Sequence, residues 1–169
     1  MLYLITDTHF GHRNIIKYCN RPENFEDLIF DNLYKIITNN DILLHLGDVA
    51  YGPEKLWIKM YMHIPGEKWL VKGNHDRKKT EWYEALGFTK VYDEWFRYVD
   101  NDYGTIVFSH KPRDLEQFTS YNIHGHCHNS EIKSFSEDSP FRYHAEYNKR
   151  LSIELENYKP VSLNNFLNR

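Results

Sequence analysis

The sequence is poor in cysteine, in long apolar runs and in positive charge. Its two cysteines, Cys19 and Cys127, do not make a disulfide framework, and nothing in the sequence suggests export. No apolar run approaches the roughly 20 residues needed to span a bilayer. The first five residues lack a basic region and are soon followed by Asp7, so they do not read as a signal peptide. We therefore expect a cytoplasmic protein with no membrane partner.

The charge balance argues against a protein that binds polyanions over a general basic surface. The formal net charge is −3, whereas a general polyanion-binding surface usually appears as a basic excess. If Asp7, Asp48 and Asp76 shared a pocket, their charges would repel a phosphate. Divalent cations would reverse that local sign, so an anionic substrate is expected only together with bound metal.

The order of the predicted elements indicates the fold class. At 169 residues the chain fits one domain with a substantial core. Apolar runs and apolar residues at helical spacing predict, in order, strand 2–6, helix 26–38, strand 42–46, helix 53–62 and strand 68–71. This alternation is typical of a parallel sheet covered by helices, so the sequence predicts an α/β protein.

The second half of the chain changes character. Residues 94–99 and 105–109 alternate in strand fashion around a polar segment that ends in Gly104, which predicts a hairpin. A further strand is expected just before Gly125. We also expect a strand pair over 142–147 and 150–155, a mobile loop at 134–140, and short helices at 15–18, 80–86 and 162–167.

Residues with metal-binding side chains follow five of the predicted strands. The segments are Asp7-Thr8-His9, Gly47-Asp48, Gly73-Asn74-His75-Asp76, Ser109-His110 and Gly125-His126-Cys127-His128. The carboxyl ends of strands are where α/β sheets build their sites, so these groups are expected to converge on one crevice. Within the first and last segments, the two ligands are two residues apart and would point the same way on extended backbone.

The expected ligands are seven oxygen and nitrogen donors without a thiolate. They are Asp7, His9, Asp48, Asn74, His110, His126 and His128. Such donors suit Mn²⁺, our first choice, and also Fe, Zn²⁺, Ni²⁺ and Co²⁺. Seven donors are too many for one zinc site and suit two metals that share a bridging carboxylate. Two such ions can bridge a hydroxide, orient a phosphoryl group and stabilise an in-line transition state.

The ordered motifs resemble those of the calcineurin-like metallophosphoesterase superfamily. The variant Asp7-Thr8-His9-Phe10-Gly11-His12 is similar to its small bacterial and phage members. The resemblance implies a four-layer α/β/β/α sandwich, with two mixed sheets flanked by helices. It also implies a single domain over residues 1–169 without a cap, because only one helix fills the widest gap between motifs.

The resemblance further implies a role for each motif residue. Asp7, His9 and His128 would hold one metal; Asn74, His110 and His126 would hold the other; and Asp48 would bridge them. His75 would protonate the leaving group or stabilise the phosphoryl oxygens, with Asp76 orienting its imidazole. That pairing makes physical sense because a neighbouring carboxylate raises the share of imidazolium near neutral pH.

Several other polar residues lie close to the motifs in the sequence. His12, Arg13 and Arg77 are candidates for binding the substrate phosphate, with loop packing or solvated surface as the alternative reading. His45 and His124 lie within apolar strands, so we expect them to be core or supporting groups rather than ligands.

Together these features predict a metal-dependent hydrolase of phosphoesters that acts through a metal-bridging hydroxide. A diester is preferred over a monoester, because an open crevice with few fixed cations suits a single negative charge. One alternative is a nuclease acting on DNA or RNA, which would need an extended positive or aromatic groove. An alternative of a different class is a catalytically inactive protein-binding scaffold, but His75 and all seven ligands are present.

Overall fold

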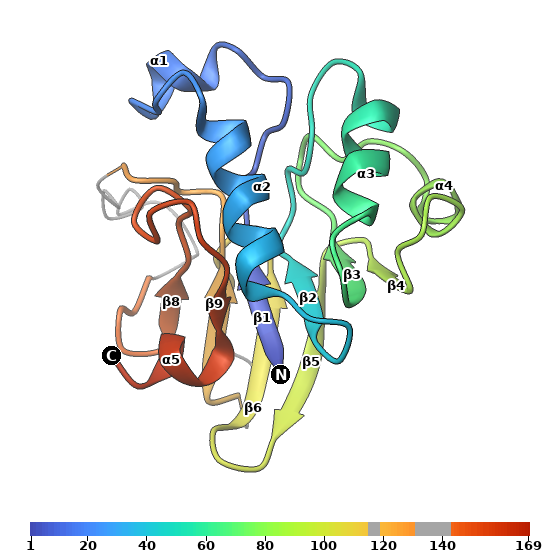
Figure 1. The fold of residues 1–169 in the computed structure, drawn as a ribbon. Coiled ribbons are helices and arrows are strands. Elements are labelled where there is room, and N and C mark those ends of the chain that lie inside the picture. The colour runs from blue at the N-terminus through green and yellow to red at the C-terminus, as the bar shows by residue number, and fades with distance from the viewer. Residues whose placement is uncertain (115–118, 131–142) are drawn as a thin grey trace.

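The computed structural model describes residues 1–114, 119–130 and 143–169 as two mixed β-sheets with flanking helices (Figure 1). The first sheet has the strand order β4-β3-β2-β1-β9. Its strands are β1 (Leu2–Ile5), β2 (Ile42–His45), β3 (Glu67–Val71), β4 (Lys90–Tyr92) and β9 (Val161–Ser162). The first four run parallel, and β9 pairs antiparallel with β1. In Figure 1 the chain starts at the lower end of β1, so the carboxyl ends of the parallel strands lie towards the top.

The second sheet has the strand order β5-β6-β7-β8. Its strands are β5 (Trp95–Asp100), β6 (Gly104–Ser109), β7 (Tyr121–His124) and β8 (Asn148–Arg150). The predicted hairpin is confirmed, since β5 and β6 pair antiparallel across the turn. The strands β6, β7 and β8 then run parallel to one another.

Each central strand of the first sheet is buried on both faces. Leu43 of β2 and Leu70 of β3 pack in one core with the helices, whereas their neighbours Leu44 and Val71 pack in a second core with the other sheet. Successive side chains of a strand point to opposite faces, so burial on both faces produces an unbroken apolar run rather than an alternating one.

The outer face of the first sheet is covered by α1 (Ile15–Tyr18), α2 (Phe25–Ile36), α3 (Glu54–Met62) and α4 (Thr80–Glu84). The last helix, α5 (Leu163–Leu167), packs instead into the core between the two sheets. The buried face of α2, formed by Phe25, Ile29 and Leu33, joins Ile58 and Tyr61 of α3 in the core against this sheet. The predicted α/β sandwich of two mixed sheets with flanking helices is therefore confirmed.

The structure differs from the sequence-based prediction at several short elements. The predicted strand pair over 142–147 and 150–155 is wrong, because the described residues 143–147 contain no strand, β8 ends at Arg150 and residues 153–158 are turns. This short strand pairs parallel with β7 instead of with the segment before it. The strands β4 and β9 were not predicted, since two or three residues are too few to show a period. The expected loop at 134–140 lies outside the described residues.

Within the described ranges, no helix is long and apolar enough to cross a membrane.

The core between the two sheets yields a prediction about stability. Leu44 is fully buried in that core, so Leu44→Ala should lower the free energy of unfolding by about 2–5 kcal/mol. Leu56 on α3 is 58% exposed, and Leu56→Ala should change the free energy of unfolding by no more than about 0.5 kcal/mol. Urea denaturation of both variants measures the difference, and equal midpoints would contradict the assigned core.

Candidate metal centre

Every predicted ligand follows the carboxyl end of a strand. Asp7 follows β1, Asp48 follows β2 and Asn74 follows β3 in the first sheet. His110 follows β6 and His126 follows β7 in the second. The parallel pairings align these strand ends, and the turns that follow them meet at one end of the sandwich. The predicted convergence is therefore seen for both sheets.

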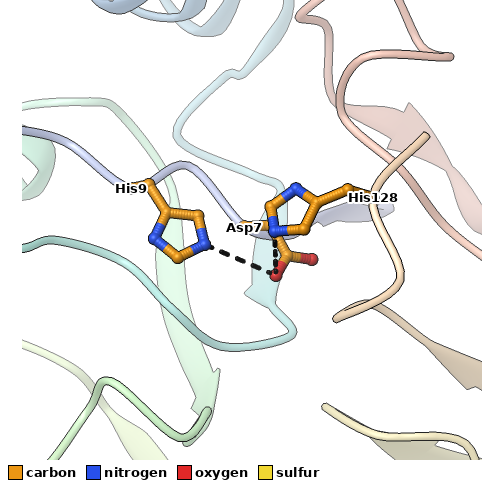
Figure 2. A group of neighbouring side chains, drawn as sticks. All are labelled: Asp7, His9 and His128. Carbon is orange, nitrogen blue, oxygen red and sulfur yellow. Dashed lines mark ion pairs between the residues drawn. The ribbon is translucent and has the colours of Figure 1, made fainter. Parts of the chain in front are cut away.

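The first cluster consists of Asp7, His9 and His128, whose ligand atoms lie within 4.8 Å of one another (Figure 2). The Oδ1 atom of Asp7 is 3.8 Å from Nε2 of His9 and 3.7 Å from Nε2 of His128. In Figure 2 the rings of His9 and His128 each direct one nitrogen at the same carboxylate oxygen of Asp7. The three side chains therefore face a common point.

The second cluster consists of Asp48, His110 and His126, again within 4.8 Å of one another. The Nε2 atom of His110 is 3.4 Å from Oδ2 of Asp48 and 3.1 Å from Nδ1 of His126. The amide oxygen of Asn74 is also 3.1 Å from that nitrogen, although Asn74 itself is exposed. All four predicted residues therefore surround one position.

Asp48 lies between the two clusters. Its Oδ2 atom is 3.6 Å from Nε2 of His9 and 3.4 Å from Nε2 of His110. Its other oxygen, Oδ1, accepts a hydrogen bond from the backbone N–H of His75 at 2.8 Å. One oxygen is thus fixed by the protein, and the other faces ligand atoms from both sides.

Buried atoms without partners show that the donor set fits a metal. Oδ1 of Asp7 and both ring nitrogens of His9 are buried and have no hydrogen-bond partner among the described residues. Buried polar atoms are normally satisfied, so three orphans in one place need an explanation. Two ligand atoms that each lie about 2.0–2.2 Å from one ion are about 3–4 Å apart, which is the spacing of Asp7 with its two histidines.

The backbone at five of the ligands is left-handed, whereas the sequence predicted extended backbone within the first and last ligand segments. Asp7, His9, Asp48, His126 and His128 have φ values of 49°, 49°, 58°, 67° and 47°. Asp7 and His9 do converge on one cluster, whereas His126 and His128 belong to different clusters, and both pairs reach the site through tight turns rather than through extended backbone. Positive φ disfavours residues with a Cβ and persists where surrounding structure enforces it, often at functional sites.

Two glycines allow the turns to approach this closely. A Cβ on Gly125 would lie 2.5 Å from Oδ2 of Asp7, and a Cβ on Gly47 would lie 2.5 Å from the backbone nitrogen of Gly73. Neither contact is sterically acceptable, so any larger residue would push the strand ends apart.

Arg21 and Glu154 support the first cluster, and neither was identified from the sequence. Oε1 of Glu154 lies 3.0 Å from Nδ1 of His128 and accepts a hydrogen bond from it, so that Nε2 faces Asp7. The buried guanidinium of Arg21 donates to Glu154 at 2.6 Å and to the backbone carbonyls of Asp7 and Thr8. No sequence pattern at Arg21 or at Glu154 could have shown that these two residues contact each other.

The histidines of the second cluster and the core are fixed in a similar way. The Nδ1 atom of His110 donates to the carbonyl of Leu46 at 2.8 Å, which leaves Nε2 free as a ligand. His45 is fully buried and joins Thr8 at 2.9 Å, and its Nδ1 accepts from the N–H of Gly47. His124 is also fully buried. The expectation that His45 and His124 are core or supporting groups agrees with these positions.

The structure corrects the expected pairing of Asp76 with His75. The carboxylate of Asp76 accepts hydrogen bonds from the backbone N–H groups of Asp48, Val49 and Gly73. Within the part of the chain that the structure describes, which includes Asp76, the Nδ1 atom of His75 has no hydrogen-bond partner, so Asp76 does not orient this ring. Burial, together with the nearby negative charge of Asp48, raises the pKa of Asp76 to about 7 despite those bonds.

His75 itself lies at the open side of the site. Its side chain is 28% exposed, and its Nε2 atom is 4.0 Å from Oδ2 of Asp48. Its ring centroid is 5.4 Å from that of His9. His75 can therefore reach both the ligand clusters and solvent.

The three predicted phosphate-binding residues differ in position. The ring of His12 is 5.5 Å from that of His9, at the edge of the first cluster. Arg13 is exposed and lies 3.6 Å from Glu26. Arg77 is exposed and lines a surface hollow with Lys72, Lys78 and Lys79.

The comparisons with known proteins agree with this geometry. The calcineurin-like phosphoesterase family model matches residues 2–162. The uncharacterized protein MJ1445 of Methanocaldococcus jannaschii is 32% identical over 96% of this chain and 86% of its own length. The gene 66 protein of Mycobacterium phage D29 is 23% identical over 79% of this chain and 81% of its own length. The crystal structure of AQ665, a protein of unknown function from Aquifex aeolicus, is 28% identical and superposes with a TM-score of 0.79 over 99% of this chain and 98% of that one.

The chain belongs to the calcineurin-like phosphoesterase family. Membership implies a hydrolase that acts on phosphoesters with divalent metal ions, and the two clusters are candidate sites for such ions.

The contact between Glu154 and His128 yields a prediction about metal affinity. Glu154→Gln removes the charge that fixes His128, so it should weaken metal binding at the first cluster about 10–100-fold. Equilibrium dialysis against Mn²⁺ measures this loss. Glu156→Gln is the matched control, because Glu156 pairs with the surface residue Arg169. Equal affinities in the two variants would show that Glu154 does not support the cluster.

Proton release on metal binding follows from the histidine environments. Burial opposes a positive charge on both His110 and His128. A hydrogen bond to Asp48 and the charges of Asp7 and Asp48 nevertheless raise the pKa of His110 to about 9. Hydrogen bonds to Cys19 and Glu154 and the charges of Asp7 and Glu154 raise the pKa of His128 to about 10. Both rings are therefore protonated at neutral pH without metal, and an ion must displace those protons. The apparent Mn²⁺ affinity should rise at least about tenfold per unit between about pH 6 and about pH 8. An affinity independent of pH would contradict this.

Proposed function

We propose that the protein is a phosphodiesterase that depends on two metal ions. Asp7, His9 and His128 hold one ion, Asn74, His110 and His126 hold the other, and Asp48 bridges them. The observation that carries this proposal is the position of Asp48, whose Oδ2 atom faces His9 of one cluster and His110 of the other within 3.6 Å. The buried unpaired atoms of Asp7 and His9 support it further.

The donor set supports manganese as the first choice of metal. The ligands are carboxylates, imidazoles and an amide, a mixture that also suits Fe, Zn²⁺, Ni²⁺ and Co²⁺. When bound, two divalent ions supply the nucleophile at neutral pH and stabilise the charge of the transition state.

His75 acts on the phosphoryl group or on the leaving group. Its partly exposed ring lies beside both clusters, and its unpaired Nδ1 leaves the imidazole free of any competing hydrogen bond. Protonated on Nε2, it can donate a hydrogen bond to a phosphoryl oxygen or a proton to the departing oxygen. Asp76 contributes indirectly, because it holds the backbone around Asp48 and Gly73.

The charge around the clusters supports a diester as the substrate. The buried guanidinium of Arg21 is occupied by Glu154 and two backbone carbonyls, so it offers no charge to a phosphoryl group. Arg13 lies near Glu26 at the surface. A site that relies on metal for its positive charge suits the single charge of a diester better than the double charge of a monoester.

The first test compares bis-p-nitrophenyl phosphate with p-nitrophenyl phosphate. Metal-stripped protein is reloaded separately with Mn²⁺, Ni²⁺, Zn²⁺ and Mg²⁺, and nitrophenolate release is followed. We expect metal-dependent release, faster from the diester. No release with any metal, in protein shown to bind two ions, would count against the proposal and favour an inactive protein-binding scaffold.

Two substitutions separate metal binding from turnover. His75→Ala should keep both ions but lose turnover by about 10²–10⁴-fold, because it removes only the proton donor. Asp48→Asn should lose both ions and turnover, because it removes the shared carboxylate. Metal content by atomic absorption and hydrolysis of the diester are measured on the same preparations. Full activity in His75→Ala would remove the role assigned to that residue.

A further inference from the structure

A continuous series of ring contacts leads from the first cluster to the protein surface. The ring centroid of His12 is 5.5 Å from that of His9 and 6.2 Å from that of His75. Tyr51 packs on the outer side of both, at 4.5 Å from His12 and 5.6 Å from His75. Tyr18 contacts His12 from another direction at 6.2 Å. Two tyrosines from distant parts of the chain thus meet at the rim of the site.

The exposure of these two rings is high for such a position. Tyr51 is 47% exposed and Tyr18 is 72% exposed, whereas Tyr61 and Tyr83 are buried in the core. A single exposed tyrosine is ordinary, but two that flank one histidine beside a candidate reaction centre form a platform of π-faces. The Nδ1 atom of His12 beside these rings is buried and finds no hydrogen-bond partner in residues 1–114, 119–130 and 143–169.

A surface groove is lined by the residues that follow Tyr51 in the chain. Gly52, the residue after Tyr51, lines a hollow of about 580 Å³ between α3 and α4. Lys55, Lys59 and Lys78 supply positive charge there, against one negative charge from Glu54. Trp82 adds a further aromatic face to the groove, and the ammonium group of Lys78 lies over it.

Flat aromatic ligands bearing a phosphate fit this combination. Nucleobases stack on aromatic side chains whatever their sequence, while the adjoining phosphates need positive charge. A phosphate that carries no ring would leave the exposed tyrosine faces without a flat surface to stack on.

We propose that Tyr18 and Tyr51 form a nucleobase-stacking site and that the substrate is a phosphodiester bearing a nucleoside. The inference rests on the proposed function, since it takes the phosphoryl group to lie between the two metal clusters. Tyr51, next to His75, stacks on the base attached to the reacting phosphate, and Tyr18 encloses that base from the side of α1. The groove beyond Gly52 takes the next nucleotide of a longer strand.

Two substrates with the same leaving group test this site. Thymidine 5′-(p-nitrophenyl phosphate) and methyl p-nitrophenyl phosphate differ only in the group that the tyrosines would hold. In the metal-loaded protein, kcat/KM should be about tenfold or more higher for the thymidine ester, the order expected for one stacked base. Tyr51→Ala and Tyr18→Ala should bring the ratio of the two values towards one, through KM.

Matched variants separate stacking from a general effect on folding. Tyr51→Phe keeps the ring and should keep the ratio. Tyr34→Ala removes a tyrosine that is 53% exposed near the end of α2 that leads into β2, away from the strand carboxyl ends, and should also keep it. Equal kcat/KM values for the two esters in the unmodified protein would overturn the proposal. So would a ratio in Tyr51→Ala that matches the ratio in Tyr34→Ala.

A binding measurement distinguishes failure of this inference from failure of the proposed function. Calorimetry compares thymidine 5′-monophosphate with inorganic phosphate on the metal-loaded protein. Tighter binding of the nucleotide, lost in Tyr51→Ala, supports the stacking site even if neither ester is hydrolysed, and only the proposed reaction would then fail. Nucleotide binding no tighter than that of phosphate overturns the stacking site even in an active enzyme. Replacing the monophosphate by a single-stranded oligothymidylate shows whether the groove holds a longer strand.

Discussion

The close approach of the turns that follow the strands is the constraint on which the rest of the structure depends. The backbone of Asp7 donates to the carbonyl of Gly47, and that of His9 donates to the carbonyl of Asp48. The backbone of Gly125 donates to the carbonyl of His110, within the second sheet. These bonds align side chains from four strands at one end of the sandwich. Five ligands accept left-handed backbone to satisfy them, a local cost that the surrounding sheets must offset.

Two buried charged groups act as clamps on these turns. Asp76 accepts three backbone hydrogen bonds and thereby joins the turn after β2 to the turn after β3. Arg21 joins the turn after β1 to Glu154, which in turn holds His128. Neither clamp is among the predicted metal ligands. Both show how the turns that carry the ligands become rigid, since buried side chains hold the backbone of these turns and the ring of His128.

The sequence was most informative where a signal was local. Each ligand segment directly follows an apolar run, so the strand ends and their convergence could be predicted from neighbouring residues. Glu154 could not, because it contacts Arg21 across 133 positions of sequence, and no period or spacing reports such a contact. Asp76 was misread for a related reason: adjacency to His75 in the chain suggested a pairing, whereas the backbone amides of the turns bind its carboxylate more completely. The strands β8 and β9 were missed or misplaced because their positions depend on pairing with distant strands.

The antiparallel pairing of β9 with β1 has a consequence for the order of assembly. The first strand and the first two ligands leave the ribosome early, but their partners Val161, Ser162, His128 and Glu154 are synthesised much later. Asp7 and His9 therefore belong to an incomplete site for most of translation, with the outer edge of β1 unpaired. Such long-range closure makes folding slow and leaves the nascent edge in need of protection. The same delay means that a half-made chain cannot present the complete first cluster to a metal ion.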